Sequence, residues 1–300
     1  MTTANKTMNA PRIRRRHDPE MDMTDHSVHA ITPYRVLSVV FLIILTILFI
    51  FPLYWIITGS FKTQQVINAR VPVWFPTNPT LNNYERLFQK PALLWLANTV
   101  LVCAAAMGLT CITASMGGYA LAKKRFTGRK VLFSIFICAM ALPKQVILIP
   151  LLKEMAFLKL HNSLWAVIFP AVGWPFGVFL MKQFSEGIPN EMLEASRIDG
   201  AGEARTFIEI ILPMIKPGIG ALAIFTFITT WNDYFLQLIM LNDTKVLTIS
   251  LGIAKLQSEL STDFGLIMAG AALGSIPIII IFLMFQKFFT RGITMGAVKG

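Results

Sequence analysis

The sequence predicts an all-α protein that crosses a membrane with six helices. Apolar residues make up 55% of the 300 positions, charged residues only 14%, and the mean hydropathy is +0.61, whereas an ordinary soluble domain carries about 25% charged residues. The apolar residues form runs of about 20 residues, the length that crosses the ~30 Å hydrocarbon core of a bilayer. These runs lack the two-residue alternation of barrel strands, so they are typical of helices.

Six apolar runs divide the membrane domain, residues 36–300, which follows an N-terminal arm, residues 1–35. The predicted spans are 36–59, 92–122, 131–152, 163–181, 218–241 and 264–286. Four of them contain no charged residue, while Lys144 lies in the third and Asp233 in the fifth. The second and sixth spans are rich in small residues, which let helix backbones approach closely in lipid. We therefore expect a packed bundle within the bilayer.

Basic residues indicate how the spans are oriented. The net charge is +11, and cations concentrate in the N-terminal arm and in residues 123–130, KKRFTGRK, which hold five cations and no acid. Loops rich in Lys and Arg stay in the cytoplasm. Both termini are therefore predicted to be cytoplasmic. The arm is interpreted as a solvated segment that sets orientation rather than as a binder of nucleic acid.

The sequence contains none of the motifs that carry common enzyme chemistry. HExxH, GxSxG and GxxxxGK[ST] are absent, so no zinc protease site, nucleophile elbow or phosphate-binding loop is predicted. The four histidines lie in predicted loops, and the three cysteines lie in apolar runs without metal-ligand spacing. We expect no catalytic residue, no metal and no cofactor bound by this chain. The sequence shows no means of hydrolysing a nucleotide, so the energy for any transport would enter from elsewhere.

Two ionisable residues inside the predicted spans are candidates for a solute path. Exposing a charge to lipid costs at least ~2.5 kcal/mol, so a charge in a span usually faces a polar cavity. Lys144 follows Pro143 in the third span, and Asp233 lies beside Trp231 and Asn232 in TWNDYF, near the end of the fifth. The alternative is snorkelling to the interface or a bond to a carbonyl freed by the proline. Two charged residues within the spans are few for an ion-coupled carrier.

Residues 182–217 form the most informative loop, and their pattern predicts a helix–turn–helix. Asn190 is expected to cap the first helix after Pro189. Asp199–Gly200 is expected to end that helix, because glycine tolerates the left-handed conformation of a C-cap. Pro213 is expected to stop or kink the second helix. The apolar face of the second helix is predicted from the helical spacing of Ala204, Phe207, Ile208, Ile211 and Leu212.

This loop is acidic, although it lies on the predicted cytoplasmic side, where cations are expected. It holds four basic and six acidic residues in a protein of net charge +11. An amphipathic segment that lies on anionic lipid is normally basic, so adhesion to the bilayer is disfavoured. A groove on a partner protein with complementary basic groups is favoured, and a purely structural interfacial hairpin is the alternative.

The small and charged residues of the loop have a characteristic spacing. Glu194-Ala195-Ser196 is followed after three residues by Gly200, after nine more by Ile210, and after one more by Leu212-Pro213. This pattern resembles the EAA loop of bacterial ABC importer permeases, with Ser196 where that family usually has alanine. The matching loop spans residues 188–213.

Other segments resemble the second permease subunit of maltose-type carbohydrate importers in particular. They are Asn98 at the start of the second span, GGYALAKKRFTGRK (117–130), LPKQVILIP (142–150), IPNEMLEASRIDGA (188–201), TWNDYF (230–235) and GAVKG (296–300). The resemblance covers residues 35–300. Lys144 departs from it, because a small residue is expected at that position.

The resemblance implies a type I ABC importer permease with six helices in the bacterial inner membrane. It implies four kinds of partner: a homologous permease, two cytoplasmic ABC ATPases that use the ATP, an extracytoplasmic solute-binding protein and a sugar-like solute. Residues 188–213 would be the cytoplasmic coupling loop, in which Glu194 pairs with a basic residue of one ATPase and Gly200 forms the elbow. The C-terminal tail would also reach the ATPase. The expected ATPase-coupling residues are Glu194, Ala195, Ser196, Asp199, Gly200, Ala201, Phe207, Ile210, Leu212 and Pro213.

Three alternatives stay open at this point. The EAA loop is shared by permeases for other solutes, so glycerol phosphate, an amino acid or a peptide is a competing substrate. A secondary carrier driven by an ion gradient would need more acids within the spans than Asp233 alone. A membrane-embedded enzyme would need a nucleophile with a base, or a metal set.

Overall fold

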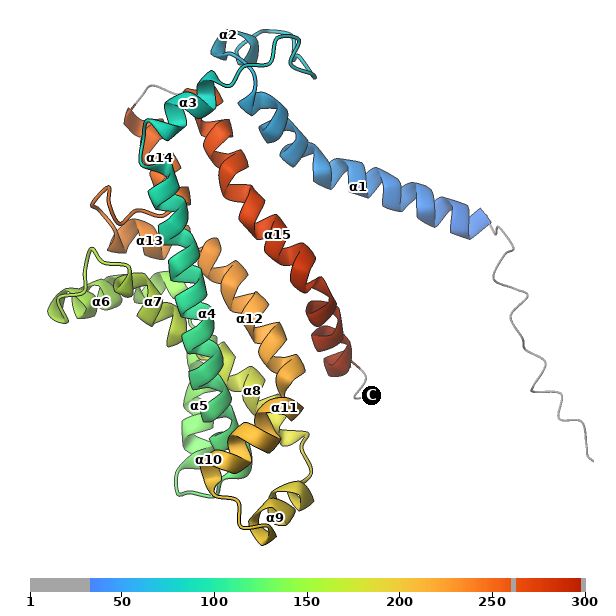
Figure 1. Ribbon diagram of the computed structural model, residues 1–300, viewed down its shortest axis with the longest axis vertical. Coiled ribbons are helices and arrows are strands. Elements are labelled where there is room, and N and C mark those ends of the chain that lie inside the picture. Colours follow the sequence, from blue (N-terminus) through green and yellow to red (C-terminus); the bar gives the residue numbers. More distant parts are fainter. Residues whose placement is uncertain (1–32, 260–262, 298–300) are drawn as a thin grey trace, which may run out of the picture. The chain divides into compact units, whose positions relative to one another are not determined.

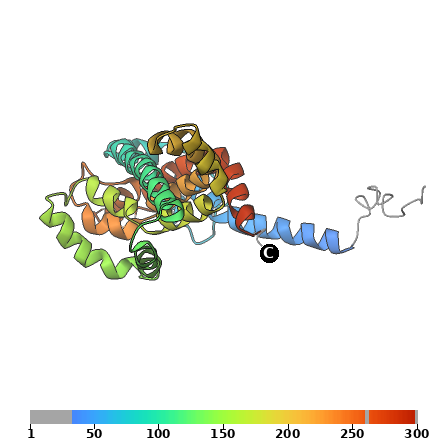
Figure 2. The same ribbon diagram turned by 90° about the horizontal axis from the view of Figure 1, so that it is seen from below.

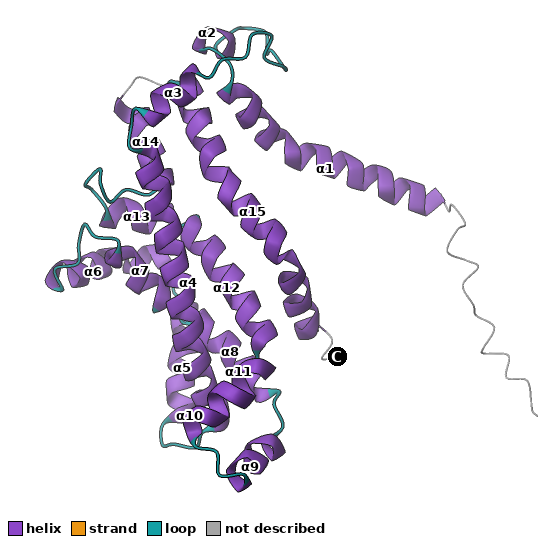
Figure 3. Ribbon diagram, viewed as in Figure 1, coloured by secondary structure: helices purple, strands orange, loops and turns teal. Residues whose placement is uncertain are grey.

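The computed structural model describes residues 33–259 and 263–297. Every element within those residues is helix or loop, with no strand, as Figure 3 shows. The all-α prediction is therefore confirmed. Most of the expected N-terminal arm (residues 1–32) and the end of the C-terminal tail (residues 298–300) lie outside the described residues.

The elements follow one another along the chain as labelled in Figure 1. They are α1 (Pro33–Ser60), α2 (Gln64–Ile67), α3 (Asn82–Phe88), α4 (Ala92–Lys123), α5 (Arg129–Met140), α6 (Lys144–Phe157), α7 (Trp165–Val172), α8 (Phe176–Glu186), α9 (Asn190–Ile198), α10 (Glu203–Thr206), a π-helical turn (Phe207–Ile211), α11 (Leu212–Met214), α12 (Lys216–Trp231), α13 (Tyr234–Met240), α14 (Ile249–Glu259) and α15 (Phe264–Ala297).

The chain forms two units, which meet within α1. The first unit ends at Phe51 and the second begins at Pro52. In the described part of the first unit, residues 33–51 form a continuous apolar helix. The second unit holds the other helices and all of the contacts discussed below.

Four helices of the described residues are long and apolar enough to cross a membrane, or up to six if each of two bent pairs is one span. The first bent pair is α5 with α6, which turn by 108°, and the second joins Glu203–Met214 to α12 at 76°. The predicted span 131–152 is therefore not one straight helix. Its break at residues 141–143 has a local cause, because Pro143 lacks an N–H and disfavours helical conformation in the residue before it.

The predicted span 218–241 is also interrupted. Helix α12 ends at Trp231, and α13 begins at Tyr234. The Asp233 side chain caps α13 by accepting a hydrogen bond from the backbone N–H of Leu236 at 3.4 Å. A carboxylate at a helix start satisfies an N–H that has no partner within the helix, so it favours a new start at this position.

Helix α4 is the centre of the second unit and packs against α7, α8, α12 and α14. Small residues allow α4 to approach its neighbours closely. Gly118, for example, lies directly against the backbone of α8 at Met181 and Lys182. One buried cluster gathers around Trp95, Phe227 and other apolar residues, and a second includes Tyr119, Met181 and Ile211. The expectation of a closely packed bundle is confirmed for this helix.

Polar side chains at the start of α4 hold the segment that precedes α14. Trp95 Nε1 donates to the carbonyl of Thr244 at 2.9 Å, and Asn98 Nδ2 donates to the carbonyls of Lys245 and Leu247, both at 2.9 Å. A buried carbonyl without a partner costs free energy. Asn98 therefore has a structural role in joining two parts of the chain that lie far apart in sequence.

Candidate functional site

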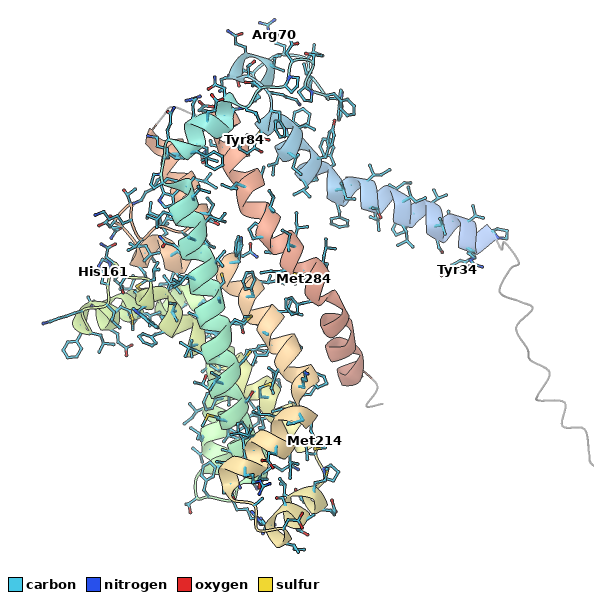
Figure 4. All side chains as sticks on the ribbon, viewed as in Figure 1. Tyr34, Arg70, Tyr84, His161, Met214 and Met284 are labelled. Carbon is cyan, nitrogen blue, oxygen red and sulfur yellow. The ribbon has the colours of Figure 1, made fainter. Side chains whose placement is uncertain are left out.

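The predicted helix–turn–helix lies at one end of the second unit, at the bottom of Figure 1. It consists of α9, α10, the π-helical turn and α11, which together span Asn190–Met214. Figure 2 shows the same end from below. In Figure 4, Met214 lies toward this end and Arg70 lies at the opposite end. We call Asn190–Met214 the elbow segment.

The turn of the elbow segment has a defined backbone geometry. Helix α9 ends at Ile198 with Asp199 as its C-cap residue, and Gly200 adopts a positive φ of +74°. The N–H of Ala201 donates to the carbonyl of Ser196 at 2.9 Å, and the N–H of Gly200 donates to that of Arg197 at 3.1 Å. These are the two hydrogen bonds of a Schellman motif. The predicted stop at Asp199–Gly200 is confirmed.

The start of α9 differs from the prediction. The helix begins at Asn190 itself, with Pro189 at the cap position and no side-chain cap hydrogen bond. Asn190 Oδ1 instead accepts a hydrogen bond from Lys123 Nζ at 3.1 Å, and the same ammonium donates to the carbonyl of Ile188 at 2.5 Å. The prediction of Asn190 as N-cap is wrong, because the Asn190 side chain instead accepts a hydrogen bond from Lys123, which is distant in sequence.

Ser196 joins the two arms of the elbow segment. It is 3% exposed, and its Oγ donates to the carbonyl of Leu193 at 3.0 Å and lies 3.1 Å from Thr206 Oγ1. Thr206 is 5% exposed and belongs to the second arm. The serine hydroxyl therefore joins the two arms by a hydrogen bond. The alanine that is usual at this position of the motif could not make this bond.

The predicted apolar face of the second arm is wrong in part. Ile211 is fully buried, and Phe207 and Leu212 are half-buried, but Ala204 is exposed and Ile208 is 60% exposed. The cause is the π-helical turn, which adds a residue to the turn and rotates the residues around it relative to an α-helical pattern. Ile210 becomes half-buried as a result.

The outer surface of the elbow segment combines acidic and apolar side chains. Glu194, Ala195 and Asp199 are exposed, and Ile198 is 86% exposed beside them. Exposed apolar side chains that are rimmed by polar ones are typical of a protein contact. The other exposed residues of the elbow segment are Asn190, Glu191, Met192, Arg197, Gly200, Gly202, Glu203, Ala204, Arg205, Ile208, Glu209, Pro213 and Met214. Its two arginines lie beside acids, Arg197 at 3.9 Å from Glu203 and Arg205 at 2.9 Å from Glu209, and Ala201 is half-buried.

Lys124, the residue after α4, links that helix to the second arm. Its ammonium forms an ion pair with Glu203 and lies 5.1 Å from the centre of the Tyr119 ring. Tyr119 contacts Phe207, with ring centres 5.5 Å apart, and Arg197 Nη2 lies 3.9 Å from Glu203 Oε1. Phe207 was expected from the sequence, but Lys124, Tyr119 and Glu203 were not, although the pair Lys123-Lys124 directly after an apolar run was the available signal.

The Lys124–Glu203 pair is expected to hold the elbow segment over a defined pH range. The hydrogen bond from Lys124 lowers the pKa of Glu203 below its ordinary 4.5. Partial burial acts to lower the pKa of Lys124, but the hydrogen bond to Glu203 and the contacts with Tyr119 outweigh it and raise the pKa above 10.5. The stabilisation is therefore present between these values. It is lost as pH falls through the lowered pKa of Glu203 or rises through the raised pKa of Lys124.

A double-mutant cycle with Lys124→Gln and Glu203→Gln checks this expectation by thermal unfolding in detergent. Because Glu203 is exposed, the coupling free energy at neutral pH is expected to be below about 1 kcal/mol. It should vanish below the lowered pKa of Glu203. An equal coupling free energy at neutral pH and at a pH below the lowered pKa of Glu203 would contradict a stabilising Lys124–Glu203 ion pair.

The two charges inside predicted spans lie together in the structure. Lys144 Nζ is 3.5 Å from Asp233 Oδ2 and 4.8 Å from the centre of the Trp174 ring. All three residues line a cavity of about 150 Å³. Trp231 does not line it, because this side chain is 4% exposed and stacks against Phe227 in the core.

Asn232, the fourth path residue expected from the sequence, is exposed and bonds within its own helix. Its Nδ2 donates to the carbonyl of Ile228 at 2.9 Å. It is not among the residues that line the cavity. Within the described residues, no group of three or more His, Cys, Asp or Glu side chains is arranged to hold a metal ion.

An all-α chain with four to six apolar helices and a protruding acidic helix–turn–helix is a polytopic membrane protein. Its residues 92–295 match the family model described as "binding-protein-dependent transport system inner membrane component", and the chain belongs to that family. The family comprises ABC transporter permease subunits, which have no ATPase site of their own. The resemblance predicted from the EAA spacing is confirmed.

Two curated relatives and one solved structure illustrate the similarity. The chain is 33% identical to the "arabinooligosaccharides transport system permease protein AraQ" of Halalkalibacterium halodurans over 84% of this chain and 91% of that protein. It is 32% identical to the "maltodextrin transport system permease protein MdxG" of Bacillus subtilis over 89% and 96%. A chain of a bacterial ABC transporter that imports the acidic polysaccharide alginate shares the fold, with a TM-score of 0.76, 22% identity, and coverage of 85% and 96%.

Proposed function

We propose that this chain is a permease subunit of an ATP-driven, binding-protein-dependent importer of a carbohydrate or polyol. Membership of the inner membrane component family supports the class of transporter. The solutes in the names of two relatives, arabinooligosaccharides and maltodextrin, support an uncharged saccharide. A cavity lined by one cation and one anion fits an uncharged solute better than an acidic one.

The proposed assembly places this chain beside a homologous permease in the inner membrane. Two ABC ATPases would bind on the cytoplasmic side, and a solute-binding protein on the other side. Both termini of this chain and the elbow segment would then be cytoplasmic. The bent pair α5–α6 would be the third of six spans, and α12, without the elbow segment, would belong to the fifth. ATP would be bound and hydrolysed by the ATPase subunits alone.

The observation that carries the proposed coupling role is an exposed acidic and apolar surface on a segment that is firmly joined to α4. The Schellman turn at Gly200 and the Ser196–Thr206 contact hold the two arms together. The Lys124–Glu203 pair and the hydrogen bonds from Lys123 to Ile188 and Asn190 join them to α4. When the ATPase dimer closes on ATP, a segment held in this way would move as one body. It would displace α4 and α12 and switch the cavity between its inward and outward states.

Glu194 is the acidic side chain best placed to test this role, because it is exposed and no ion pair is recorded for it within the described residues. In cells that lack the chromosomal gene, a plasmid copy would carry Glu194→Lys. Uptake of labelled arabinotriose and maltotriose is expected to fall at least about tenfold, since reversing one charge at an interface costs a few kcal/mol. The variant should accumulate in the membrane at the wild-type level but no longer co-purify the ATPase.

Glu85→Lys is the matched control, because Glu85 is exposed on α3 at the opposite end of the second unit. It should leave ATPase co-purification unchanged. The coupling role is rejected if Glu194→Lys transports and binds ATPase like the wild type. Wild-type uptake of an amino acid, a peptide or glycerol phosphate in place of any saccharide would favour a competing substrate. Uptake that survives loss of ATP but not loss of the ion gradient would favour a secondary carrier.

A further inference from the structure

A cavity of about 150 Å³ lies where three helices are interrupted. Lys144 is the first residue of α6 after the break at 141–143, Trp174 lies between α7 and α8, and Asp233 lies between α12 and α13. Figure 1 shows α6, α7 and α13 side by side, about midway along α4, and contacts of α13 with both α6 and α7 agree. Non-helical backbone at membrane depth is tolerated where it is buried in protein or lines a polar cavity. This position therefore fits a binding site.

The ion pair in the cavity is loose and leaves hydrogen-bonding capacity on both sides. Lys144 Nζ and Asp233 Oδ2 are 3.5 Å apart, which is long for a charge-assisted hydrogen bond. The other carboxylate oxygen of Asp233 accepts the N–H of Leu236 at 3.4 Å, which is also a long contact. An ammonium has three donors and a carboxylate has about four acceptor sites. The pair therefore offers donors and acceptors at one place without net charge.

Thr110 of α4 provides an independent observation that favours a ligand site. Thr110 is 3% exposed and lines the cavity. Its Oγ1 has no hydrogen-bond partner within the described residues. Buried hydroxyls in folded proteins nearly always have a partner. Packing alone gives no reason for a threonine here, since valine has the same shape. Thr110 Oγ1 itself has less than 1 Å² of accessible surface, so a ligand hydroxyl would supply the partner once the threonine side chain rotates toward the cavity.

Size and lining together restrict what fits. An apolar cavity of about 150 Å³ accepts one benzene molecule, and a sugar ring with its hydroxyls is larger than benzene. This cavity is partly open, so it can receive part of one ring but not a longer saccharide. Its walls combine the Trp174 ring with the polar groups of Thr110, Lys144 and Asp233. One aromatic surface and a few convergent polar groups are typical of small-molecule sites. The same combination matches a sugar ring, which has apolar C–H faces and hydroxyls around its edge.

We infer that this cavity binds one ring of a neutral saccharide, with ring hydroxyls bonded to Lys144, Asp233 and Thr110 and a C–H face toward Trp174. The inference rests on the proposed function and adds a solute-binding site contributed by this chain itself. An acidic sugar is disfavoured, because its carboxylate would compete with Asp233 for Lys144 and leave one of two anions unpaired.

Thr110→Val is the most informative variant. It removes only the hydroxyl, and because that hydroxyl has no partner in the protein, the thermal unfolding midpoint should stay equal or rise. The assay uses the complete importer, with all partner subunits, in membrane vesicles. The KM for arabinotriose and maltotriose should rise about tenfold, because the variant loses one hydrogen bond to a sugar hydroxyl. Lys144→Gln should raise the KM as well.

Thr113→Val is the matched control on the same helix. Thr113 is exposed, and its Oγ1 donates to the carbonyl of Leu109 at 2.8 Å, within α4. Transport kinetics of this variant should equal those of the wild type. The same uptake assays would include trigalacturonate as an acidic probe.

The outcomes separate this inference from the proposed function. A raised KM for the neutral saccharides in Thr110→Val and Lys144→Gln, with Thr113→Val unchanged, supports the site. Wild-type import of neutral saccharides together with unchanged KM values in both variants overturns the site and leaves the proposed function standing. If the wild type imports trigalacturonate in preference to the neutral saccharides, the inference that the site binds a neutral sugar is wrong. A wild type that imports no saccharide overturns both.

Discussion

Replacing Gly118 with alanine is expected to destabilise the protein by about 1–3 kcal/mol, the usual cost of overpacking a well-packed contact. A Cβ at this position would lie 2.6 Å from both the backbone N of Lys182 and the carbonyl C of Met181 on α8. Neither atom belongs to a flexible side chain, so α4 and α8 would have to move apart. Small residues let membrane helices approach at such distances, and the packing gained there drives their association.

Gly117→Ala, one position earlier, should have the opposite sign. A Cβ at Gly117 would lie 3.6 Å from Val178 Cγ2, which is an ordinary contact. Alanine within a helix is favoured over glycine by roughly 0.5–1 kcal/mol, so this variant is expected to be as stable as the wild type or more stable. Thermal unfolding of both purified variants in detergent measures the difference. Equal unfolding midpoints for the two variants would mean that α4 and α8 accommodate an added methyl group at Gly118 without cost, which contradicts the prediction.

Replacing Gly200 with alanine is expected to impair transport without unfolding the chain. A Cβ at Gly200 meets no atom within 4 Å, so the cost comes from the backbone alone. A φ of +74° costs an L-residue about 1–2 kcal/mol. That strain would lower the population of the present turn about tenfold relative to relaxed alternatives. Saccharide uptake and the amount of sugar moved per ATP hydrolysed should fall accordingly.

Two further variants show whether the backbone is the cause. Gly202→Ala also places its Cβ in open space, but φ at Gly202 is −69°, so uptake should stay at the wild-type level. Gly200→Asn should transport better than Gly200→Ala, because asparagine tolerates the left-handed region. If Gly200→Ala and Gly202→Ala transport equally well, the turn geometry has no part in coupling.

Local signals in the sequence were sufficient for the helix class and for much of the elbow segment. Uncharged runs determine which segments are helical in lipid, and the stop at Asp199–Gly200 follows from glycine at the C-cap. The break before Lys144 also has a local cause, because a proline acts on its own turn and on the residue before it. The EAA spacing identified the family, since all its members lie within one loop of 26 residues, 188–213.

Other features depend on contacts that no local pattern contains. The π-helical turn at Phe207–Ile211 decided which face of the second arm is buried, so a prediction from regular α-helical spacing placed Ala204 and Ile208 on the wrong side. Asn190 was predicted to cap its own helix, but Lys123 of another helix bonds its side chain. Propensities describe a residue and its near neighbours along the chain, whereas the choice of partner depends on which surfaces meet.

The sequence by itself determined that this is a helical membrane permease with an acidic elbow, because hydropathy, proline, glycine and motif spacing act over short stretches of chain. Only the tertiary structure brought Lys144, Asp233 and Thr110 to one cavity and placed Trp231 in the core instead. The reason is physical: these residues come from α6, the α12–α13 break and α4, and their proximity follows from the packing of helices and their breaks, which no local stretch encodes.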